Sequence, residues 1–190
     1  ESISAPQVGG IVKLTGFILK TSLIIEMIGA ALLAPVFCND LGIAKGLWYS
    51  LFHSISAFCN AGFDLFGIKE PFSSLTFYHS NIYLNIVIIL LIITGGIGFL
   101  VWGDIGTHKY RIRRFSLQSK VVLMTSAVLI VLPALYFFFY EYNRETIHDR
   151  TIHSLFQSVT TRTAGFNTTD LAAMDESGTA IMIILMLIGG

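Results

Sequence analysis

The sequence predicts an all-α membrane protein built from parallel membrane-pore-membrane repeats, each consisting of a helix, a pore loop and a second helix. Two observations lead to this prediction. First, 54% of the 190 residues are hydrophobic and only 13% are charged. Soluble domains carry about 25% charged residues, so this surface suits lipid better than water. Second, one pattern occurs twice: a short apolar helix, a small glycine-containing turn and a long apolar stretch.

The first membrane span is predicted over residues 18–37, after a glycine-containing connector at residues 1–13. At 1.5 Å per residue, the 20 residues of this mostly apolar stretch can cross a hydrocarbon core of about 30 Å. Pro35 and the polar segment Cys38–Asp40 are expected to end the span.

The next apolar stretch, residues 48–58, is too short to cross a bilayer and too apolar for an exposed loop. It is typical of a helix that enters the membrane and turns back. The turn Asn60-Ala61-Gly62-Phe63 follows. A full span is then predicted over residues 82–103, broken by the glycine-rich segment 94–98, where a neighbouring backbone could approach closely.

The second half of the chain repeats this order. A span is predicted at residues 121–140, a short semi-apolar helix at 151–161, and a truncated span at 180–190. The turn Thr163-Ala164-Gly165-Phe166 stands between the last two. Because a repeat of fixed length indicates repeated structural units, we expect two units of about one hundred residues in the same orientation.

We therefore divide the chain into a second membrane-pore-membrane repeat at 14–103, a basic loop at 104–120 and a truncated third repeat at 121–190. The loop carries five Lys and Arg residues, and short loops rich in these residues face the cytoplasm. The chain starts at Glu1 without a Met and stops at Gly190 inside an apolar run, so we expect a piece of a larger protein.

The two turns carry the chemistry that the sequence predicts. Irregular backbone at membrane depth requires burial in protein or a watery cavity, and rings of carbonyls can replace the hydration shell of a monovalent cation. The preceding helix directs its partially negative end toward the ion, and glycine permits conformations closed to residues with a Cβ. The expected cation ligands are the backbone carbonyls of Asn60, Ala61, Gly62, Phe63, Thr163, Ala164, Gly165 and Phe166.

Glu26 lies inside the first predicted span, where a carboxylate is costly unless it has a partner. Arg162, directly before the second turn, is a candidate partner. We expect a structural ion pair or hydrogen bond rather than a part in conduction. The five histidines show no spacing that indicates a metal site.

The segments SISAFCNAGFD (54–64) and SVTTRTAGFN (158–167) resemble the second and third pore loops of the Trk/Ktr/HKT superfamily, particularly the bacterial Ktr-type membrane subunit. The resemblance implies potassium uptake across a bacterial cell membrane by a multi-pass protein. One filter glycine from each of four repeats would surround the ion, and Gly62 and Gly165 match two of them. K⁺ is then the transported ion, and no bound cofactor is expected.

The resemblance also implies partners. They are the remaining repeats of the same polypeptide, a second copy in a homodimer, the lipid bilayer and a cytoplasmic nucleotide-binding regulatory ring. The loop at 104–120 is the expected contact for the ring, and a gating loop would start at Gly189-Gly190. Positive-inside topology explains the basic loop without nucleic acid.

Two other hypotheses remain open. A coupled transporter of another cation, such as sodium, often has inverted repeats, whereas these units run parallel. An intramembrane enzyme needs acids, a Ser–His pair or metal ligands at depth, and the uncharged spans 82–103 and 121–140 offer none. We therefore do not expect an enzyme.

Overall fold

The computed structural model describes residues 8–68, 71, 73–109 and 111–189, and all regular structure within them is helical. The α-helices are α1 (Val8–Leu41), α2 (Ile43–Phe58), α3 (Ile82–Gly96), α4 (Phe99–His108), α5 (Leu117–Tyr136), α6 (Ile147–Thr160) and α7 (Glu176–Gly189). Single 3₁₀ turns occur at Phe66–Ile68, Thr76–Tyr78, Ile112–Arg114 and Leu171–Ala173, and a π-helical segment at Phe137–Glu141.

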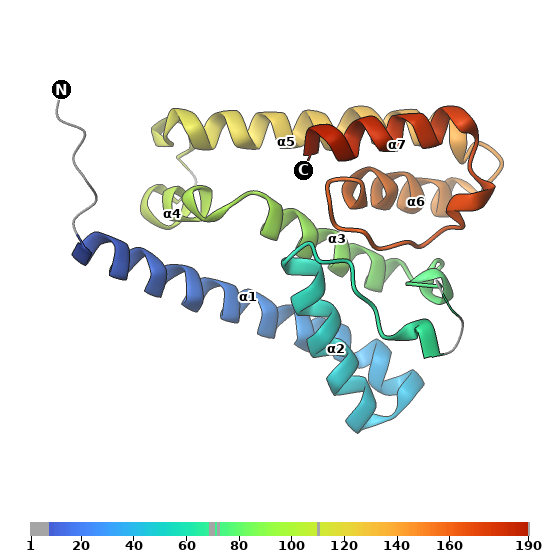
Figure 1. Ribbon diagram of the computed structural model, residues 1–190, viewed down its shortest axis with the longest axis horizontal. Helices are drawn as coiled ribbons and strands as arrows, with labels where there is room; N and C mark the ends of the chain where they lie inside the picture. Colours follow the sequence, from blue (N-terminus) through green and yellow to red (C-terminus); the bar gives the residue numbers. More distant parts are fainter. Residues whose placement is uncertain (1–7, 69–70, 72, 110, 190) are drawn as a thin grey trace.

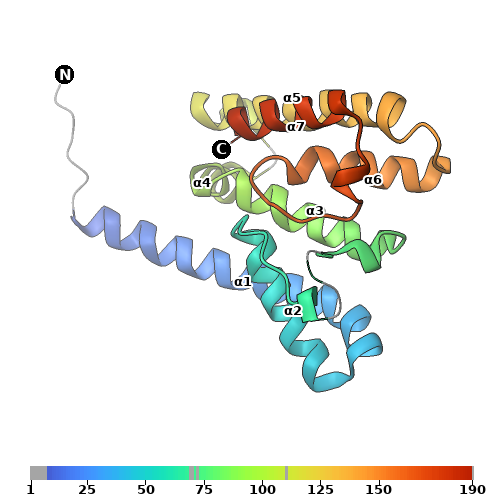
Figure 2. The ribbon, with the colours of Figure 1, turned by 45° about the vertical axis from the view of Figure 1, so that its right-hand side comes forward.

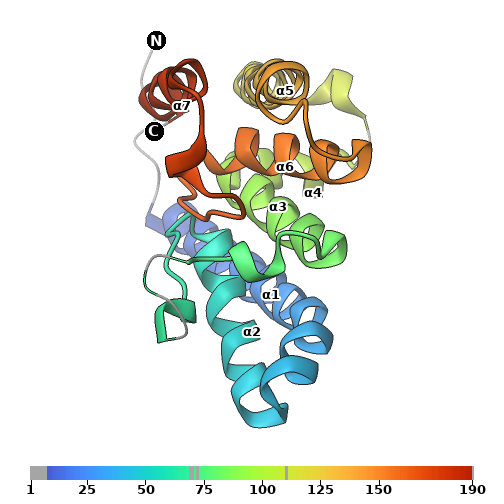
Figure 3. The ribbon, with the colours of Figure 1, turned by 90° about the vertical axis from the view of Figure 1, so that its right-hand side faces the viewer.

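Helix α3 runs through the middle of the molecule (Figure 1). The hairpin of α1 and α2 packs on one side of it, and α6 packs on the other side beneath α5 and α7 (Figures 2 and 3). The main buried cluster joins both sides, because it includes Phe37 of α1, Ile88 of α3 and Phe156 of α6. The two predicted turns therefore lie where the halves of the chain meet.

Helices of membrane length confirm the predicted class of an all-α membrane protein. The apolar stretches Val12–Leu41 and Leu117–Glu141 are each long enough to cross a bilayer. A third span exists if α3 and α4 are counted together, although the two helices meet at 93°. The remaining apolar helix, α7, was predicted to begin at residue 180 and begins at Glu176.

The predicted limits of the first span were wrong at both ends. Residues 8–13 of the expected connector belong to α1, and residues 1–7 lie outside the described part of the chain. At the other end, α1 continues through Pro35 to Leu41. The chain reverses at Gly42, which has a φ of +81°. Glycine adopts this conformation without the strain of a Cβ, so Gly42 rather than the proline determines where the helix ends.

The span predicted at residues 82–103 is divided into α3 and α4, which meet at 93°, and the break falls within the glycine-rich segment 94–98 that was expected to interrupt it. Gly98, with a φ of +80°, begins α4 in a new direction. The predicted close approach does occur at Gly95, where an added Cβ would overlap the backbone carbonyl of Phe58. The glycine-rich segment therefore both bends the chain and brings α3 against the end of α2.

Three further boundaries differ from the prediction. Helices α2 and α6 begin at Ile43 and Ile147, several residues earlier than expected, and Thr146 caps α6 by accepting from Asp149 N. The expected loop at 104–120 begins within α4 and ends within α5, whose first residue is Leu117. Hydropathy alone missed the start of α6, because its polar first turn is stabilised by the Thr146 cap rather than by lipid.

Candidate cation-binding site

Each predicted turn directly follows one of the two short helices. Asn60 and Gly62 have positive φ angles of 51° and 69°, and the matching residues Thr163 and Gly165 have 68° and 81°. Positive φ therefore occurs at the first and third positions of both turns. Both turns therefore share the same irregular backbone, which at membrane depth is tolerated where it is buried in protein or lines a cavity.

Two of these four residues are not glycine. Asparagine tolerates the left-handed region, whereas Thr163 is β-branched and is a genuine outlier there. Its hydroxyl donates to the Arg162 carbonyl at 2.6 Å. Strained residues of this kind cost about 1–3 kcal/mol and are concentrated at functional sites, so the backbone of the second turn is held in place by its surroundings.

Equivalent hydrogen bonds anchor the two turns to their own helices. Ser56 Oγ donates to the Phe63 carbonyl at 2.7 Å, and Thr160 Oγ1 donates to the Phe166 carbonyl at 2.7 Å. The last carbonyl of each predicted set thus already accepts one hydrogen bond. The first three carbonyls of each turn accept none from the residues that the structure describes.

The two turns touch at their glycines. A Cβ added to Gly62 would lie 2.9 Å from Gly165 Cα, and a Cβ added to Gly165 would lie 3.5 Å from Gly62 Cα. The aromatic residues that follow differ in environment, because Phe166 is fully buried whereas Phe63 is 70% exposed. The structure therefore brings all eight predicted ligand residues into one region.

The short helices are also fixed to the preceding long helices in an equivalent way. Ser54 Oγ donates to the Glu26 carbonyl in α1 at 2.7 Å, and Ser158 Oγ donates to the Ile130 carbonyl in α5 at 2.5 Å. Ser158 and Ile130 each follow their counterparts by 104 residues. A matching pair of contacts thus sets the position of both turns.

The predicted pairing of Glu26 with Arg162 was wrong. The Glu26 carboxylate instead accepts a weak hydrogen bond from Cys59 Sγ at 3.8 Å. Arg162 Nη2 donates to Ser126 Oγ of α5 at 3.0 Å. The two side chains belong to different halves of the chain, and each finds a partner within its own half.

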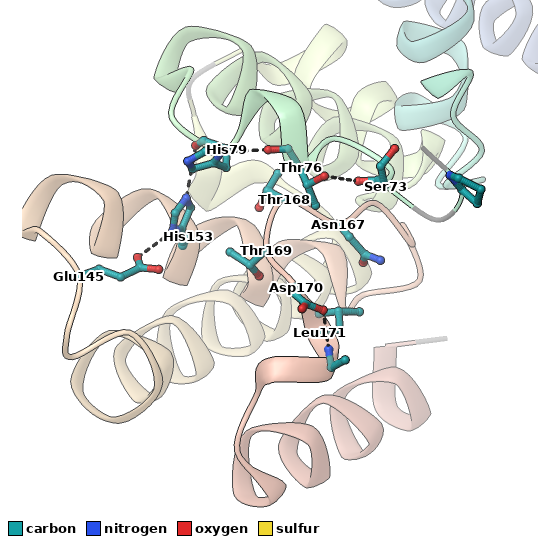
Figure 4. Close-up of a pocket in the computed structure, with 12 residues that line it drawn as sticks. Ser73, Thr76, His79, Glu145, His153, Asn167, Thr168, Thr169, Asp170 and Leu171 are labelled. Atoms are coloured by element: carbon teal, nitrogen blue, oxygen red, sulfur yellow. Dashed lines mark hydrogen bonds and ion pairs between the residues drawn. The ribbon is translucent and has the colours of Figure 1, made fainter. Parts of the chain in front are cut away.

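A polar pocket of about 730 Å³ lies between the two halves (Figure 4). His153 of α6 lies at its wall, with Nδ1 2.7 Å from Glu145 Oε2 and Nε2 3.3 Å from the His79 carbonyl oxygen. Both partners offer acceptor oxygens, so each ring nitrogen of His153 faces a group that can accept a hydrogen bond. The sequence did not reveal this contact, because His79 and His153 are far apart in the chain.

Tyr142 packs against the ring of His153 and contacts Thr169 Oγ1 at 3.0 Å. Burial raises the pKa of Tyr142 to about 12, and the nearby carboxylates of Glu141 and Glu145 act in the same direction. The hydroxyl therefore stays protonated at neutral pH. Tyr142 and His153 together support the segment that follows the second turn.

The bond between Glu145 and His153 gives a direct test of this support. We expect Glu145→Gln to lower the free energy of unfolding by about 1 kcal/mol, because a charge-assisted hydrogen bond becomes a neutral one. Thermal unfolding of the purified protein would measure the change. In a His153→Gln background the same substitution is expected to have no further effect, and equal losses in both backgrounds would contradict the assignment.

Residues 4–190 match the TrkH family, which is described as a cation transport protein. The chain belongs to this TrkH family. The chain is 40% identical to the potassium/sodium uptake protein NtpJ of Enterococcus hirae and 37% identical to Ktr system potassium uptake protein B of Bacillus subtilis, in each case over 100% of its own length and 42% of the relative. It is 34% identical to Ktr system potassium uptake protein B of Vibrio alginolyticus, over 93% of the chain and 39% of the relative.

These similarities confirm the resemblance to the Trk/Ktr/HKT superfamily. The chain spans about two fifths of the length of these relatives. Since the family is one of cation transport proteins and not of enzymes, the alternative of an intramembrane enzyme is rejected.

Proposed function

We propose that this chain is part of a potassium-uptake protein of the cell membrane and that K⁺ passes beside the two turns. The observation that carries the proposal is the repeated backbone pattern: positive φ at the first and third residues of both turns, which meet at Gly62 and Gly165. Carbonyls from Asn60 to Phe63 and from Thr163 to Phe166 would replace water around the ion. Relatives named as potassium uptake proteins support the choice of ion.

The proposal includes the arrangement of the chain into repeats. Residues 14–103 and 121–190 would form two membrane-pore-membrane units, joined by the cytoplasmic segment 104–120. The equivalent contacts of Ser54 and Ser158 with the preceding long helices support two units of one design. A complete ring of carbonyls needs further turns of the same kind, supplied by other parts of the polypeptide.

Partners of the full protein are part of the same proposal. Relatives named as components of a Ktr system support a membrane subunit that works with other proteins. We expect a homodimer and a cytoplasmic nucleotide-binding ring, with the basic segment 104–120 as the contact. The proposed gate begins at Gly189-Gly190, and Gly190 lies outside the described residues.

A second candidate is uptake of sodium together with potassium. It is favoured by one observation, the name of the E. hirae relative as a potassium/sodium uptake protein. Uptake of both ions by liposomes containing the full-length protein, measured separately and in competition, distinguishes the two functions. Sodium uptake that saturates and depends on potassium would favour coupling over selective potassium passage.

The test of the filter itself is Gly165→Ser in the full-length protein. A Cβ at Gly165 would meet Gly62 Cα at the ordinary contact distance of 3.5 Å, so the main cost is about 1–2 kcal/mol of backbone strain. We expect the protein to assemble but to lose at least tenfold of its preference for potassium over sodium uptake, about 1.4 kcal/mol. Gly42→Ser, which introduces similar strain in open space, serves as the control. Unchanged preference in Gly165→Ser would contradict the proposal.

A further inference from the structure

The connection between α4 and α5 carries four exposed basic residues, Lys109, Arg111, Arg113 and Arg114. None of the four forms an ion pair with an acid in the part of the chain that the structure describes. A position on the cytoplasmic side accounts for an excess of basic residues. It does not require them to gather around a hollow, so their arrangement needs a separate explanation.

Asp104 is the single acid of segment 104–120, and its carboxylate is occupied by other partners. Its Oδ2 accepts hydrogen bonds from Ser116 N at 2.9 Å, from Ser116 Oγ at 2.7 Å and from Ser119 Oγ at 2.6 Å. Its Oδ1 lies 3.8 Å from His108 Nδ1. Asp104 therefore joins α4 to the beginning of α5, and the basic residues of the connection remain available to an anion.

Two hollows share Arg111 and Arg114 in their walls, and their volumes are about 400 and 500 Å³. Sites for small molecules typically have volumes of about 300–1,000 Å³. No acid is among the described residues that line either hollow. The other lining residues are polar or basic apart from one isoleucine: Thr107, His108, Lys109, Ile112 and Arg113.

The backbone that carries the two shared arginines is held in place. A single 3₁₀ turn joins them, in which Arg114 N donates to the Arg111 carbonyl at 2.8 Å. Lys120 Nζ donates to the Arg113 carbonyl at 2.9 Å, and Phe115, directly after the turn, is buried. The two arginine side chains thus begin from a fixed spacing, which lowers the cost of ordering them around a ligand.

The hollows lie where the chain meets the edge of the membrane. The stretch Leu117–Glu141 can cross a bilayer, and α4 lies at the same end of the molecule as its first residue (Figure 1). Because α4 meets α3 at 93°, it lies along the bilayer surface when α3 crosses the bilayer. Ile112 and Leu117 are 61% and 79% exposed. Exposed apolar side chains thus stand beside exposed cations, which suits a partner with an anionic head and apolar chains.

We propose that Arg111 and Arg114 bind the phosphate headgroup of an anionic phospholipid in the cytoplasmic leaflet. The planar guanidinium group matches phosphate with two parallel hydrogen bonds, and basic residues beside a membrane helix are attracted to anionic lipid. Ile112 and Leu117 would contact the acyl chains. The inference depends on the proposed cytoplasmic position of segment 104–120 and not on the proposed filter.

Thermal unfolding of the full-length protein in neutral detergent, with added phosphatidylglycerol or phosphatidylcholine, tests the site. We expect phosphatidylglycerol to raise the midpoint more than the neutral lipid does. In the double variant Arg111→Gln/Arg114→Gln, the concentration that gives half of this rise should increase about thirtyfold, because two cations are lost. Arg144→Gln is the control, since this exposed arginine lies beyond the other end of α5 and should leave the response unchanged.

A second double variant, Arg111→Lys/Arg114→Lys, separates a phosphate site from general attraction to charge. Lysine keeps the charge but lacks the planar fork, so we expect a response between those of the wild type and the glutamine variant. A full wild-type response in the lysine variant would overturn the inference. Midpoints without lipid show whether each variant is folded.

Three other results would also overturn the inference. One is an equal rise with phosphatidylglycerol and phosphatidylcholine. Another is a wild-type response in the glutamine variant, which would leave the two arginines to the proposed regulatory ring. The third is an equal rise with glycerol 1-phosphate, which would assign the hollows to a free phosphate compound. Gly165→Ser should respond to phosphatidylglycerol as the wild type does, so failure of the filter and failure of the lipid site are distinguishable.

Discussion

Gly62→Ala is expected to abolish potassium uptake by the full-length protein and to lower its thermal stability. The φ of +69° at Gly62 costs an L-residue about 1–2 kcal/mol. An alanine Cβ would in addition overlap the Ala164 carbonyl oxygen and lie 2.9 Å from Gly165 Cα. Both neighbours are backbone atoms that cannot rotate away, so overpacking adds about 1–3 kcal/mol and forces the two turns apart.

Two other glycines separate these contributions. Gly42 has a φ of +81° with no described atom within 4 Å of an added Cβ, so Gly42→Ala introduces the strain alone. Gly165→Ala introduces the strain at the turn with only an ordinary contact. We expect stability to fall most in Gly62→Ala and about equally in the other two, whereas uptake should suffer only at Gly62 and Gly165. Normal uptake by Gly62→Ala would show that potassium uptake does not require close packing of the two turns.

The sequence was sufficient for features that depend on local pattern. Long apolar runs predicted the helices of membrane length, because the hydropathy of a segment indicates whether it lies in lipid or in water. The repeated Ala-Gly-Phe motif located both turns, and Gly62 and Gly165 do have the positive φ angles that only glycine adopts freely. Positive φ at Thr163 could not be predicted, because a β-branched residue there is explained only by its tertiary surroundings.

Features that depend on neighbours distant in sequence were missed. The glycine-rich segment 94–98 was expected to interrupt the span, but the 93° change of direction between α3 and α4 was not predicted, because composition carries no information about direction. Glu26 and Arg162 seemed suitable partners by charge, but Cys59 and Ser126 lie nearer to them. A small cavity of about 130 Å³, lined by Asn60, Ile92 and Arg162, lies where the ends of α2 and α6 approach α3. No single stretch of sequence indicates it.

Gly95→Ala is the second substitution with a large expected effect, because it acts on the contact that places the first turn. In a helix, glycine to alanine normally stabilises by about 0.5–1 kcal/mol. At Gly95, however, the new Cβ would overlap the Phe58 carbonyl oxygen and lie 2.8 Å from the Phe58 carbonyl carbon. Helix α3 must then move away from the end of α2, and we expect a loss of about 2–4 kcal/mol together with most of the uptake.

Gly16→Ala is the matched control, since Gly16 lies in α1 with no described atom within 4 Å of an added Cβ. It should leave uptake unchanged and leave the thermal midpoint equal or slightly higher. Both substitutions gain the same helix propensity. The difference in thermal midpoint between the two alanine variants therefore reports only the close contact of residue 95 with Phe58. If both variants unfold at the wild-type temperature, α3 does not rest on Phe58, and the position of Asn60 must depend on other contacts.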